Sequence, residues 1–427
     1  MKFTLGVTLV AMMSLFCWHA ASQTYDTNGD YVQTFVGSGE QGDLDGQGLL
    51  TKFSNPSQIV SDTASNLYVW DSGNNLFRKI TPNGVVSTFA GGGTDFEGFG
   101  TNVSFANYSF GQIAIDHANT IWVVASFGGN NFLLNIKVNG YVSIQNGGSG
   151  LTNLSTSSGI CFDSANNLYY GGGNIIYRYN PTTGLAYPFA GNGTSGYRDG
   201  NGTVFPEFSF GSSPALASDQ ANNIYVWDAY NGYWWGSGNC RIRRVDPSQN
   251  ITTIAGNGSY GNLDGVGTNT GFGSISQMFS DNLGNIYFAC GTCIRRMDAQ
   301  TNVVTLAGNF SQNGYADGAG NLALFNSANG ACLSQGMIFV ADSANQVIQN
   351  ITFNPTPQVL SPANLQLNTY PGLQITGSVG RTYQIQTSPD LNSWSIKANL
   401  LLTSSPYLWI DQNSVSGNKF YRAVMLP

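Results

Sequence analysis

Apolar and polar residues alternate along most of this chain in runs of five or six positions, a period of two that predicts β-strands. Turn residues such as Asn-Gly and Asp-Gly separate the runs. The clearest unit contains four runs in succession, at residues 57–62, 66–71, 76–81 and 85–90. The pattern therefore predicts an all-β fold built from antiparallel four-stranded sheets with tight turns.

This unit recurs along the chain. A run of the type Asn-apolar-aromatic-apolar anchors each copy, with its aromatic residue at Tyr68, Trp122, Tyr169, Tyr225, Tyr287 and Phe339. Repeats of about 50 residues made of short strands are typical of propellers. A lone strand at 31–36 precedes the first unit, and the last unit ends after its third strand. We therefore predict a six-bladed β-propeller at 31–354 with four-stranded blades, closed by the N-terminal strand within the last blade.

A Gly-rich segment carrying one acid precedes five of the six units. The acids are Asp45, Glu97, Asp199, Asp264 and Asp317. In four copies a Phe follows eight residues later, and in the copy of Asp199 nine residues later. Such constant spacing indicates packing, so we predict structural acids that cap their turns and Phe side chains that fill the seams between blades. Calcium held by carboxylate and carbonyl oxygens is the alternative, although one acid per loop is sparse for such a site.

Both ends of the chain differ from the repeats. Lys2, an apolar stretch at 5–16 and the small residues Ala20-Ala21-Ser22 indicate a signal peptide at 1–22, which predicts a secreted, cell-surface or periplasmic protein without a transmembrane segment. After the repeats, three prolines within 355–363 predict a stiff linker, and further strand-like runs predict a small β module at 364–427.

Two resemblances rest on specific strings. The first unit carries Asn66-Leu-Tyr-Val-Trp-Asp71, then Phe77-Arg-Lys-Ile80, and resembles the NHL-repeat family of six-bladed propellers over 31–354. That resemblance implies a binding platform, although some relatives are lyases, lactonases or hydrolases. The string from Arg381 to Trp394 is similar to a C-terminal β-sandwich appended to many secreted bacterial proteins.

Composition narrows the function classes. Charged residues make up 9% of the chain and its net charge is −7, which argues against a nucleic-acid partner. His117 is the one histidine after the signal peptide, too few for a His-liganded zinc site. Basic pairs recur on the third strands, at Arg78-Lys79, Arg243-Arg244 and Arg295-Arg296, and we interpret them as a solvated strand face.

Three acids end equivalent second strands: Asp71, Asp228 and Asp342. One interpretation is that they converge on the central channel, where a lactonase-like relative holds a divalent cation between carboxylates. The commoner role of such an Asp is to accept backbone amide bonds in the following turn.

The least repetitive stretch is the loop at 229–239, which carries Tyr230, Tyr233, Trp234 and Trp235. Aromatic side chains flanked by Gly and Asn suit stacking on a sugar ring or anchoring a protein partner. A loop folded over its blade as a hydrophobic plug is the alternative. Alternate connections of a blade share a face, so this loop lies on the same rim as the Gly-rich segments.

Five cysteines remain after the signal peptide, and two of them, Cys290 and Cys293, flank a predicted hairpin turn. The ends of a four-residue turn lie within bridging range, which predicts a disulfide. A redox-active dithiol is the alternative, although the helix N-terminus that such motifs use is not predicted there. We expect Cys161 and Cys332, in apolar strands, to be buried thiols.

The sequence therefore predicts an exported, non-catalytic binding propeller without a cofactor, whose rim holds a protein or a carbohydrate. The alternative is a metal-dependent lactonase- or lyase-like enzyme with its site in the central channel.

Overall fold

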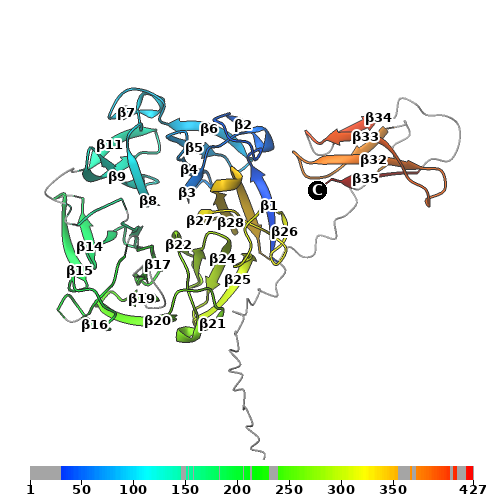
Figure 1. Cartoon of the computed structure of the whole chain (residues 1–427). Coiled ribbons are helices and arrows are strands. Elements are labelled where there is room, and N and C mark those ends of the chain that lie inside the picture. Colours follow the sequence, from blue (N-terminus) through cyan, green and yellow to red (C-terminus); the bar gives the residue numbers. More distant parts are fainter. Residues whose placement is uncertain are drawn as a thin grey trace, which may run out of the picture.

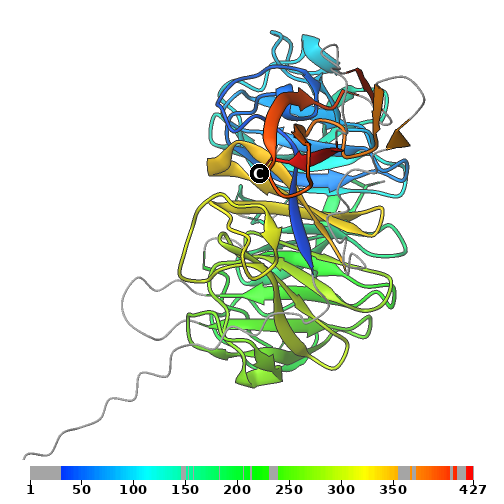
Figure 2. The same ribbon diagram turned by 90° about the vertical axis from the view of Figure 1, so that its right-hand side faces the viewer.

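The computed structural model shows a ring of six antiparallel sheets around a central axis, with a small separate module beside it (Figure 1). Figure 2 gives the view turned by 90°, in which the module lies in front of the strand β1 (Tyr31–Val36). The structure describes residues 30–353 apart from 146–150, 152, 157, 182, 205, 212–213 and 230–238, and then residues 366–367, 372–403, 407–410 and 420–426.

Each sheet is one blade, and its long strands follow one another outward from the axis. From the axis outward, blade 1 contains β3 (Pro56–Ser61), β4 (Leu67–Asp71), β5 (Leu76–Ile80), β6 (Val85–Ala90) and β2 (Gly46–Gln47). Blade 2 contains β8 (Ser109–Ile115), β9 (Ile121–Phe127), β10 (Asn130–Ile136), β11 (Tyr141–Gln145) and β7 (Gly98–Phe99). Blade 3 contains β12 (Ile160–Phe162), β13 (Leu168–Gly172), β14 (Ile175–Asn180) and β15 (Leu185–Ala190).

The second half of the ring repeats this order. Blade 4 contains β17 (Leu216–Ser218), β18 (Ile224–Asp228), β19 (Cys240–Val245), β20 (Asn250–Gly258) and β16 (Gly200–Asn201). Blade 5 contains β22 (Gln277–Ser280), β23 (Ile286–Ala289), β24 (Cys293–Met297), β25 (Asn302–Gly308) and β21 (Gly265–Val266). Blade 6 contains β27 (Ala328–Ser334), β28 (Met337–Asp342), β29 (Val347–Thr352), β1 and β26 (Gly318–Ala319). Single 3-10 turns lie at Gly48–Leu50, Gly100–Asn102, Gly267–Asn269 and Ser343–Asn345.

The ring closes as the sequence predicts. The strand β1, from the start of the chain, pairs antiparallel with β29 from the end of the repeats, with Tyr31 opposite Thr352. This pairing removes the open sheet edge that a linear array of blades would leave. The six-bladed, all-β prediction is therefore confirmed.

The blades have one strand more than the sequence predicts. In five of them a two-residue strand from the Gly-rich segment adds to the outer edge, as β2 does beside β6. Blade 3 has four strands, and it is the unit whose sequence lacks that segment. The Gly-rich segment is therefore part of the sheet and covers its outer edge.

The predicted Phe wedges lie in the seams between blades. Phe105, for example, packs with Trp70 and Phe77 of blade 1 and with Ile113 of blade 2. The set consists of Phe53, Phe105, Phe208, Phe272 and Phe325, whose side chains are at most 1% exposed. Each belongs to a core cluster that contains residues of two neighbouring blades. Burial of a Phe side chain contributes about 2 kcal/mol or more, so these residues hold the blades together.

A second repeated interaction explains the Asn-apolar-aromatic run. The turn between the first two strands of blade 4 contains Asp219, whose carboxylate accepts hydrogen bonds from the amide of Asn223 and from the Tyr225 hydroxyl at 2.9 Å. Equivalent carboxylates bind the ring donor of Tyr68, Trp122, Tyr169 and Tyr287. In blade 6 the ring is that of Phe339, which has no polar donor, and the turn has no Asp. The Asp is therefore present where a buried ring donor requires an acceptor.

We predict that Tyr225→Phe lowers the free energy of unfolding by about 1 kcal/mol, because it removes the hydrogen bond to Asp219 without changing the ring. Chemical denaturation measures the difference. Tyr187→Phe is the control, since Tyr187 lies exposed on β15, and it should leave stability unchanged. Equal effects of the two substitutions would contradict a structural role for the Tyr225 hydroxyl.

The C-terminal module consists of two three-stranded sheets. One contains β30 (Gln366–Leu367), β31 (Gly372–Ile375) and β34 (Tyr407–Ile410), and the other β33 (Ser395–Leu401), β32 (Thr382–Ser388) and β35 (Phe420–Met425). A small apolar core between them includes Ile375, Tyr383 and Ile385. The small C-terminal β module that the sequence predicts is therefore present. Among the residues described, no helix is long and apolar enough to cross a membrane.

Candidate functional site

Three of the predicted loop acids, Asp45, Asp199 and Asp264, form ion pairs with fully buried arginines. Arg78, on the third strand of blade 1, is fully buried and binds two carboxylates, that of Asp71 at 2.9 Å and that of Asp45 at 2.5 Å. Its guanidinium lies over the ring of Phe53, 5.2 Å from the ring centre. Asp45 also accepts the backbone amide of Thr88 on the fourth strand. The acid therefore ties the outer segment to its blade and does not cap its own turn, which corrects that part of the prediction.

Blade 4 repeats this arrangement. Arg243 binds Asp228 at 2.7 Å and Asp199 at 2.8 Å, and it lies over the ring of Phe208. Blade 5 retains part of it: Arg295 binds Asp264 at 2.8 Å and lies over the ring of Phe272. The first residue of each basic pair is thus fully buried. The interpretation of these pairs as a solvated strand face is wrong for Arg78, Arg243 and Arg295, because a carboxylate compensates each charge.

Blades 2 and 6 depart from the arrangement. In blade 2, Glu97 accepts the backbone amide of Ile144, and apolar Leu134 occupies the position of the arginine. In blade 6, Gln349 occupies that position and donates to Asp317. Asp317 also binds an arginine from outside its blade: the guanidinium of Arg381, in the C-terminal module, lies 3.1 Å from its carboxylate. The module is therefore attached where blade 6 has no arginine of its own.

The three predicted channel acids do not meet in the channel. Asp71, Asp228 and Asp342 lie in separate blades, fully buried, and accept the backbone amides of Ser54, Ser209 and Asn326. Among the described residues, no group of three or more His, Cys, Asp or Glu could hold a metal ion. These backbone donors lie 16 to 19 residues before their aspartates, and not in the following turn as the sequence predicts. In that turn, the side-chain amides of Asn74 and Asn345 donate to Asp71 and Asp342.

Burial gives these three acids unusual pKa values. It raises the pKa of Asp71 and of Asp228 to about 6, even though an arginine beside each lowers it. Asp342 has no arginine partner, and burial raises its pKa to about 7. The unfolded chain would carry the ordinary value of 3.8, so between about pH 4 and 7 the folded protein binds protons that the unfolded chain does not. Stability from these groups is therefore greatest at low pH and is lost as the pH rises through 6 to 7.

We predict that the melting temperature falls as the pH rises from about 4 to 7, and that Asp342→Asn reduces this slope by removing the group that titrates at about 7. Thermal melts at a series of pH values measure it. Asp390→Asn is the control: hydrogen bonds lower the pKa of that exposed acid to about 2, so it stays ionised throughout and the slope should not change. An unchanged slope in Asp342→Asn would contradict the assignment.

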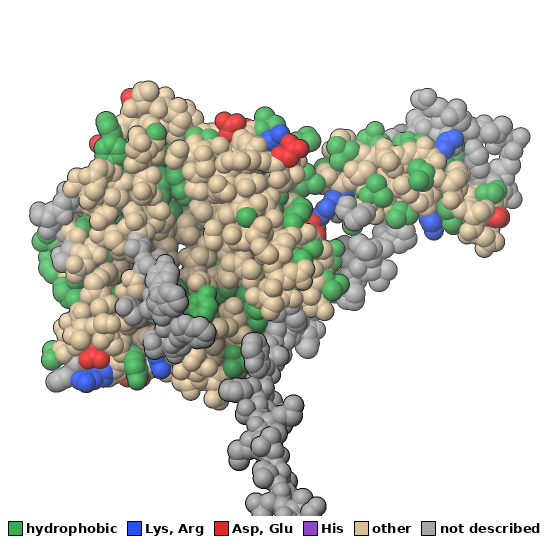
Figure 3. All heavy atoms as spheres, in the orientation of Figure 1, with side chains coloured by type: hydrophobic (Ala, Val, Ile, Leu, Met, Phe, Trp, Pro, Cys, Tyr) green, Lys and Arg blue, Asp and Glu red, His purple; other side chains and the backbone are tan. Residues whose placement is uncertain are grey.

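The central channel is narrow and mostly apolar. The innermost strands of all six blades line a cavity of about 230 Å³ with residues such as Ile113, Leu216 and Met278. Among the described residues that line it, none is His, Asp or Glu. Near one mouth, the amide of Gln112 in blade 2 donates across the ring to the carbonyl of Ser276 in blade 5. Figure 3 shows the hollow at the centre of this face and few charged side chains around it.

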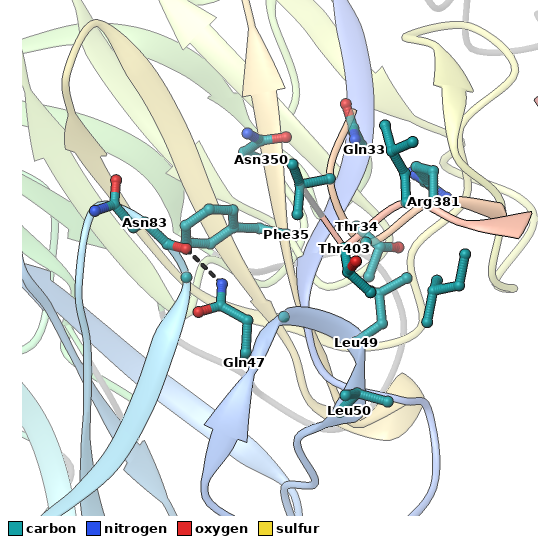
Figure 4. Close-up of a pocket in the computed structure, with 16 residues that line it drawn as sticks. Gln33, Thr34, Phe35, Gln47, Leu49, Leu50, Asn83, Asn350, Arg381 and Thr403 are labelled. Carbon is teal, nitrogen blue, oxygen red and sulfur yellow. Dashed lines mark hydrogen bonds between the residues drawn. The ribbon is translucent and has the colours of Figure 1, made fainter. Parts of the chain in front are cut away.

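A larger cavity lies on the side of the ring, where blade 1, blade 6 and the C-terminal module meet (Figure 4). Its volume is about 310 Å³. The ring contributes the half-buried ring of Phe35 on β1, the 3-10 turn Gly48–Leu50 and the turn at Asn83. The module contributes residues 379–381 and 401–403. We call this space the junction cleft.

The junction cleft combines apolar surface with amide groups. Its apolar walls come from residues such as Phe35, Leu49 and Val379. Gln33, Gln47, Asn83 and Asn350 bring amide side chains to it, and Gln47 donates to the carbonyl of Asn83. The amide oxygen of Asn350 is buried without a hydrogen-bond partner in the structure. Arg381 is the single charged residue among those lining the cleft, and Asp317 compensates it. Such a surface suits a neutral ligand that both stacks and accepts or donates hydrogen bonds.

Sequence reasoning did not identify this cleft. Its lining comes from residues 33–84, 350 and 379–403, which only the closure of the ring and the docking of the module bring together. The aromatic loop that the sequence predicts as the binding face, with Tyr230, Tyr233, Trp234 and Trp235, lies outside the described residues.

The predicted disulfide is not formed in this structure, in which Cys290 and Cys293 are free thiols. The Cys290 thiol donates a hydrogen bond to the carbonyl of Phe288, and the neighbouring Cys293 thiol lowers the pKa of Cys290. Cys161 and Cys332 are buried, as expected, and line the central channel.

Comparison with known proteins supports the fold. No family model matches the chain. A curated relative, Protein SUPPRESSOR OF QUENCHING 1, chloroplastic, from Arabidopsis thaliana, is 25% identical over 336 residues, which is 74% of this chain and 27% of the relative. The chain thus spans about a quarter of that relative's length.

Two similar solved structures come from Bacteroides thetaiotaomicron. A protein of unknown function from Bacteroides thetaiotaomicron matches with a TM-score of 0.58 and 18% identity, and an auxiliary nutrient binding protein from the same species with 0.57 and 18%. Each match covers 76% of both chains. At this level of identity the likeness shows the propeller fold.

Proposed function

We propose that this protein is an exported binding protein that holds a neutral, hydroxyl-rich ligand, such as an oligosaccharide, in the junction cleft. The cleft itself carries the proposal, because it combines a concave shape, a volume of about 310 Å³ and a lining of amides and apolar side chains. Ligand sites in proteins are usually concave and mostly apolar, with a few polar groups that fix orientation.

The chemistry of the lining selects the class of ligand. Side-chain amides both donate and accept, which matches sugar hydroxyl groups, and the ring of Phe35 offers a face for the apolar side of a sugar. A charged ligand would find one guanidinium, Arg381, and its charge is already compensated by Asp317.

Two further observations support the proposal. The chain begins with a predicted signal peptide, which would place a binding protein outside the cytoplasm. One solved structure with the same fold, from Bacteroides thetaiotaomicron, is described as an auxiliary nutrient binding protein, which suggests a comparable role for this propeller.

We predict that the double substitution Gln33→Ala and Asn83→Ala weakens binding about tenfold, because each lost hydrogen bond contributes about 0.5–1.5 kcal/mol. A glycan array would select an oligosaccharide, and titration calorimetry would compare the variants. Gln300→Ala is the control, since Gln300 is an exposed amide in the corresponding turn of blade 5. Unchanged affinity in the double variant would place the ligand elsewhere, and binding of peptides but no glycan would indicate a protein partner.

The aromatic loop at 230–238, which connects β18 and β19 along the chain, is the second candidate surface. We predict that replacing Trp234 and Trp235 with Ala weakens binding while leaving the melting temperature unchanged, if the loop holds the ligand. A lower melting temperature with unchanged binding would identify the loop as a hydrophobic plug. Comparison with the cleft variants separates the two surfaces.

The alternative, a metal-dependent lactonase- or lyase-like enzyme, needs a cation held by converging side chains. Metal analysis of the purified protein, and melts with and without a chelator, test both this alternative and calcium binding by the loop acids. A stoichiometric metal together with hydrolysis of a lactone would overturn the binding proposal.

A further inference from the structure

The hairpin between β23 and β24 in blade 5 differs from three other blades in the type of residue at one position. In blades 1, 4 and 6 the residue three places after the anchoring aromatic is a buried aspartate: Asp71, Asp228 or Asp342. In blade 5 that residue is Cys290, three places after Tyr287. A thiol therefore stands where blades 1, 4 and 6 hold a carboxylate.

The arginine opposite this position is retained. Arg295 occupies in blade 5 the place of Arg78 and Arg243, since each pairs with the residue that follows the anchoring aromatic. Arg78 and Arg243 each bind two carboxylates, whereas the carboxylate bound to Arg295 is that of Asp264. A thiolate at Cys290 would be a second anion beside Arg295, in the position of the carboxylates of Asp71 and Asp228 in blades 1 and 4. The guanidinium of Arg295 contributes to lowering the pKa of Cys290, which fits this role.

The second thiol lies directly across the turn. The backbone amide of Cys290 donates to the carbonyl of Cys293 at 2.9 Å, and Gly291 takes a positive φ of 79° that closes the turn. The ends of such a turn lie within about 7 Å, which overlaps the Cα separation of a disulfide. The Cys290 thiol donates to the carbonyl of Phe288 at 3.7 Å, and the Cys293 thiol across the turn is the largest cause of the lowered pKa of Cys290.

The turn is held in place by its neighbours. The carbonyl of Gly291 accepts the backbone amide of Ala328 in blade 6 at 2.6 Å, and the carbonyl of Thr292 accepts that of Asn309 at 3.1 Å. These bonds fix the two cysteines relative to each other, which favours exchange between them over unfolding of the hairpin.

Solvent access separates Cys290 from the other described cysteines. Cys290 is partly exposed, whereas Cys293 and the remaining described cysteines, Cys161, Cys240 and Cys332, are buried. Burial raises the pKa of each of those four thiols. Cys290 is thus the cysteine in the described structure with the properties of an attacking thiolate, and Cys293 is the adjacent thiol that can follow.

We propose that Cys290 and Cys293 form a thiol–disulfide exchange site on the rim of blade 5, with a small-molecule or protein disulfide as the oxidant. The Cys290 thiolate attacks one sulfur of the oxidant, so that a mixed disulfide forms and one thiolate leaves. Cys293 then loses its proton and attacks the Cys290 sulfur, which closes the Cys290–Cys293 disulfide and releases the second thiolate. In total one disulfide is reduced to two thiols while the cysteine pair is oxidised.

The first experiment counts released thiolates. Reduced, full-length protein is mixed with 5,5′-dithiobis(2-nitrobenzoate), an aromatic disulfide, at neutral pH without denaturant. We expect two nitrothiobenzoate ions per protein and a product two hydrogens lighter by mass spectrometry. Cys293→Ser should release one ion and retain a nitrothiobenzoate adduct, and Cys290→Ser should react far more slowly. A stable adduct in the unchanged protein, or no reaction, would overturn the proposal.

The second experiment tests the role of Arg295 as a positioning residue. Arg295→Gln should slow the reaction of Cys290 about tenfold at pH 7 and shift its pH–rate profile toward higher pH, because the guanidinium no longer stabilises the thiolate. Arg243→Gln is the matched control, because it removes the same kind of buried arginine from blade 4, where no thiol occupies the Asp position. Equal rates in the two variants would overturn the role of Arg295.

A third variant tests whether a loss of reactivity comes from loss of the fold. Cys290→Asp restores the residue of the other blades beside Arg295, so it should fold, melt at or above the temperature of the reduced protein and fail to react. If the protein as purified contains a Cys290–Cys293 disulfide that millimolar glutathione does not reduce, the pair is a structural bridge and the proposal is wrong.

Discussion

A buried positive charge must be compensated, and in this propeller that requirement organises the outer half of the blades. Arg78, Arg243 and Arg295 are fully buried, and each lies between the strands of its blade and the Gly-rich segment at its edge. Removing one partner from such a pair costs far more than the pair contributes, because the remaining charge is left in a medium of low polarity. The acids, the arginine and the Phe beneath it therefore form one unit, and that unit fixes the outer segment to the blade and the Phe in the seam.

Two departures from this unit, in blades 5 and 6, coincide with the two proposed sites. In blade 6, Gln349 replaces the arginine, and Asp317 is free to bind Arg381 of the C-terminal module. That contact lies at the edge of the junction cleft, so the same substitution that removes a buried charge from blade 6 also creates a docking point. In blade 5, a thiol replaces the carboxylate beside Arg295. In blade 6, Asp317 binds an arginine of the module in place of an arginine of its own blade. In blade 5, Cys290 occupies the position of the second carboxylate that binds the arginine in blades 1 and 4.

The two proposed sites depend on different physical interactions. The junction cleft depends on shape, since its apolar walls and amide groups converge only when blade 1, blade 6 and the module are in place. The cysteine pair depends on electrostatics over a few residues, since Arg295 and the Cys293 thiol act on Cys290 within one hairpin. The central channel, in which enzymes of similar fold are expected to place their chemistry, is lined here by apolar and neutral residues where it is described.

Repetition explains why so much of the fold could be predicted from the sequence. Six copies of the same alternating pattern specify six similar sheets, and the missing strand of the last unit together with the surplus strand 31–36 specifies the closure. The Phe positions were equally predictable, because a large apolar side chain at constant spacing must be buried at an equivalent place in every unit. Interactions within one repeat are local, so their pattern is visible in the chain.

Only the tertiary structure shows which distant segments contact each other. The prediction that the basic pairs are solvated is wrong because an acid about 30 to 45 residues earlier in the chain folds back onto the arginine. Asp45 does so onto Arg78, and Asp199 onto Arg243. The junction cleft is lined by residues from 33 to 403, and no local sequence pattern predicts it. By itself the sequence determined the number, order and closure of the blades, because these follow from the periodicity of apolar positions. The structure decided the partners of the charges and the position of the cleft, because both depend on which surfaces meet after the ring has closed.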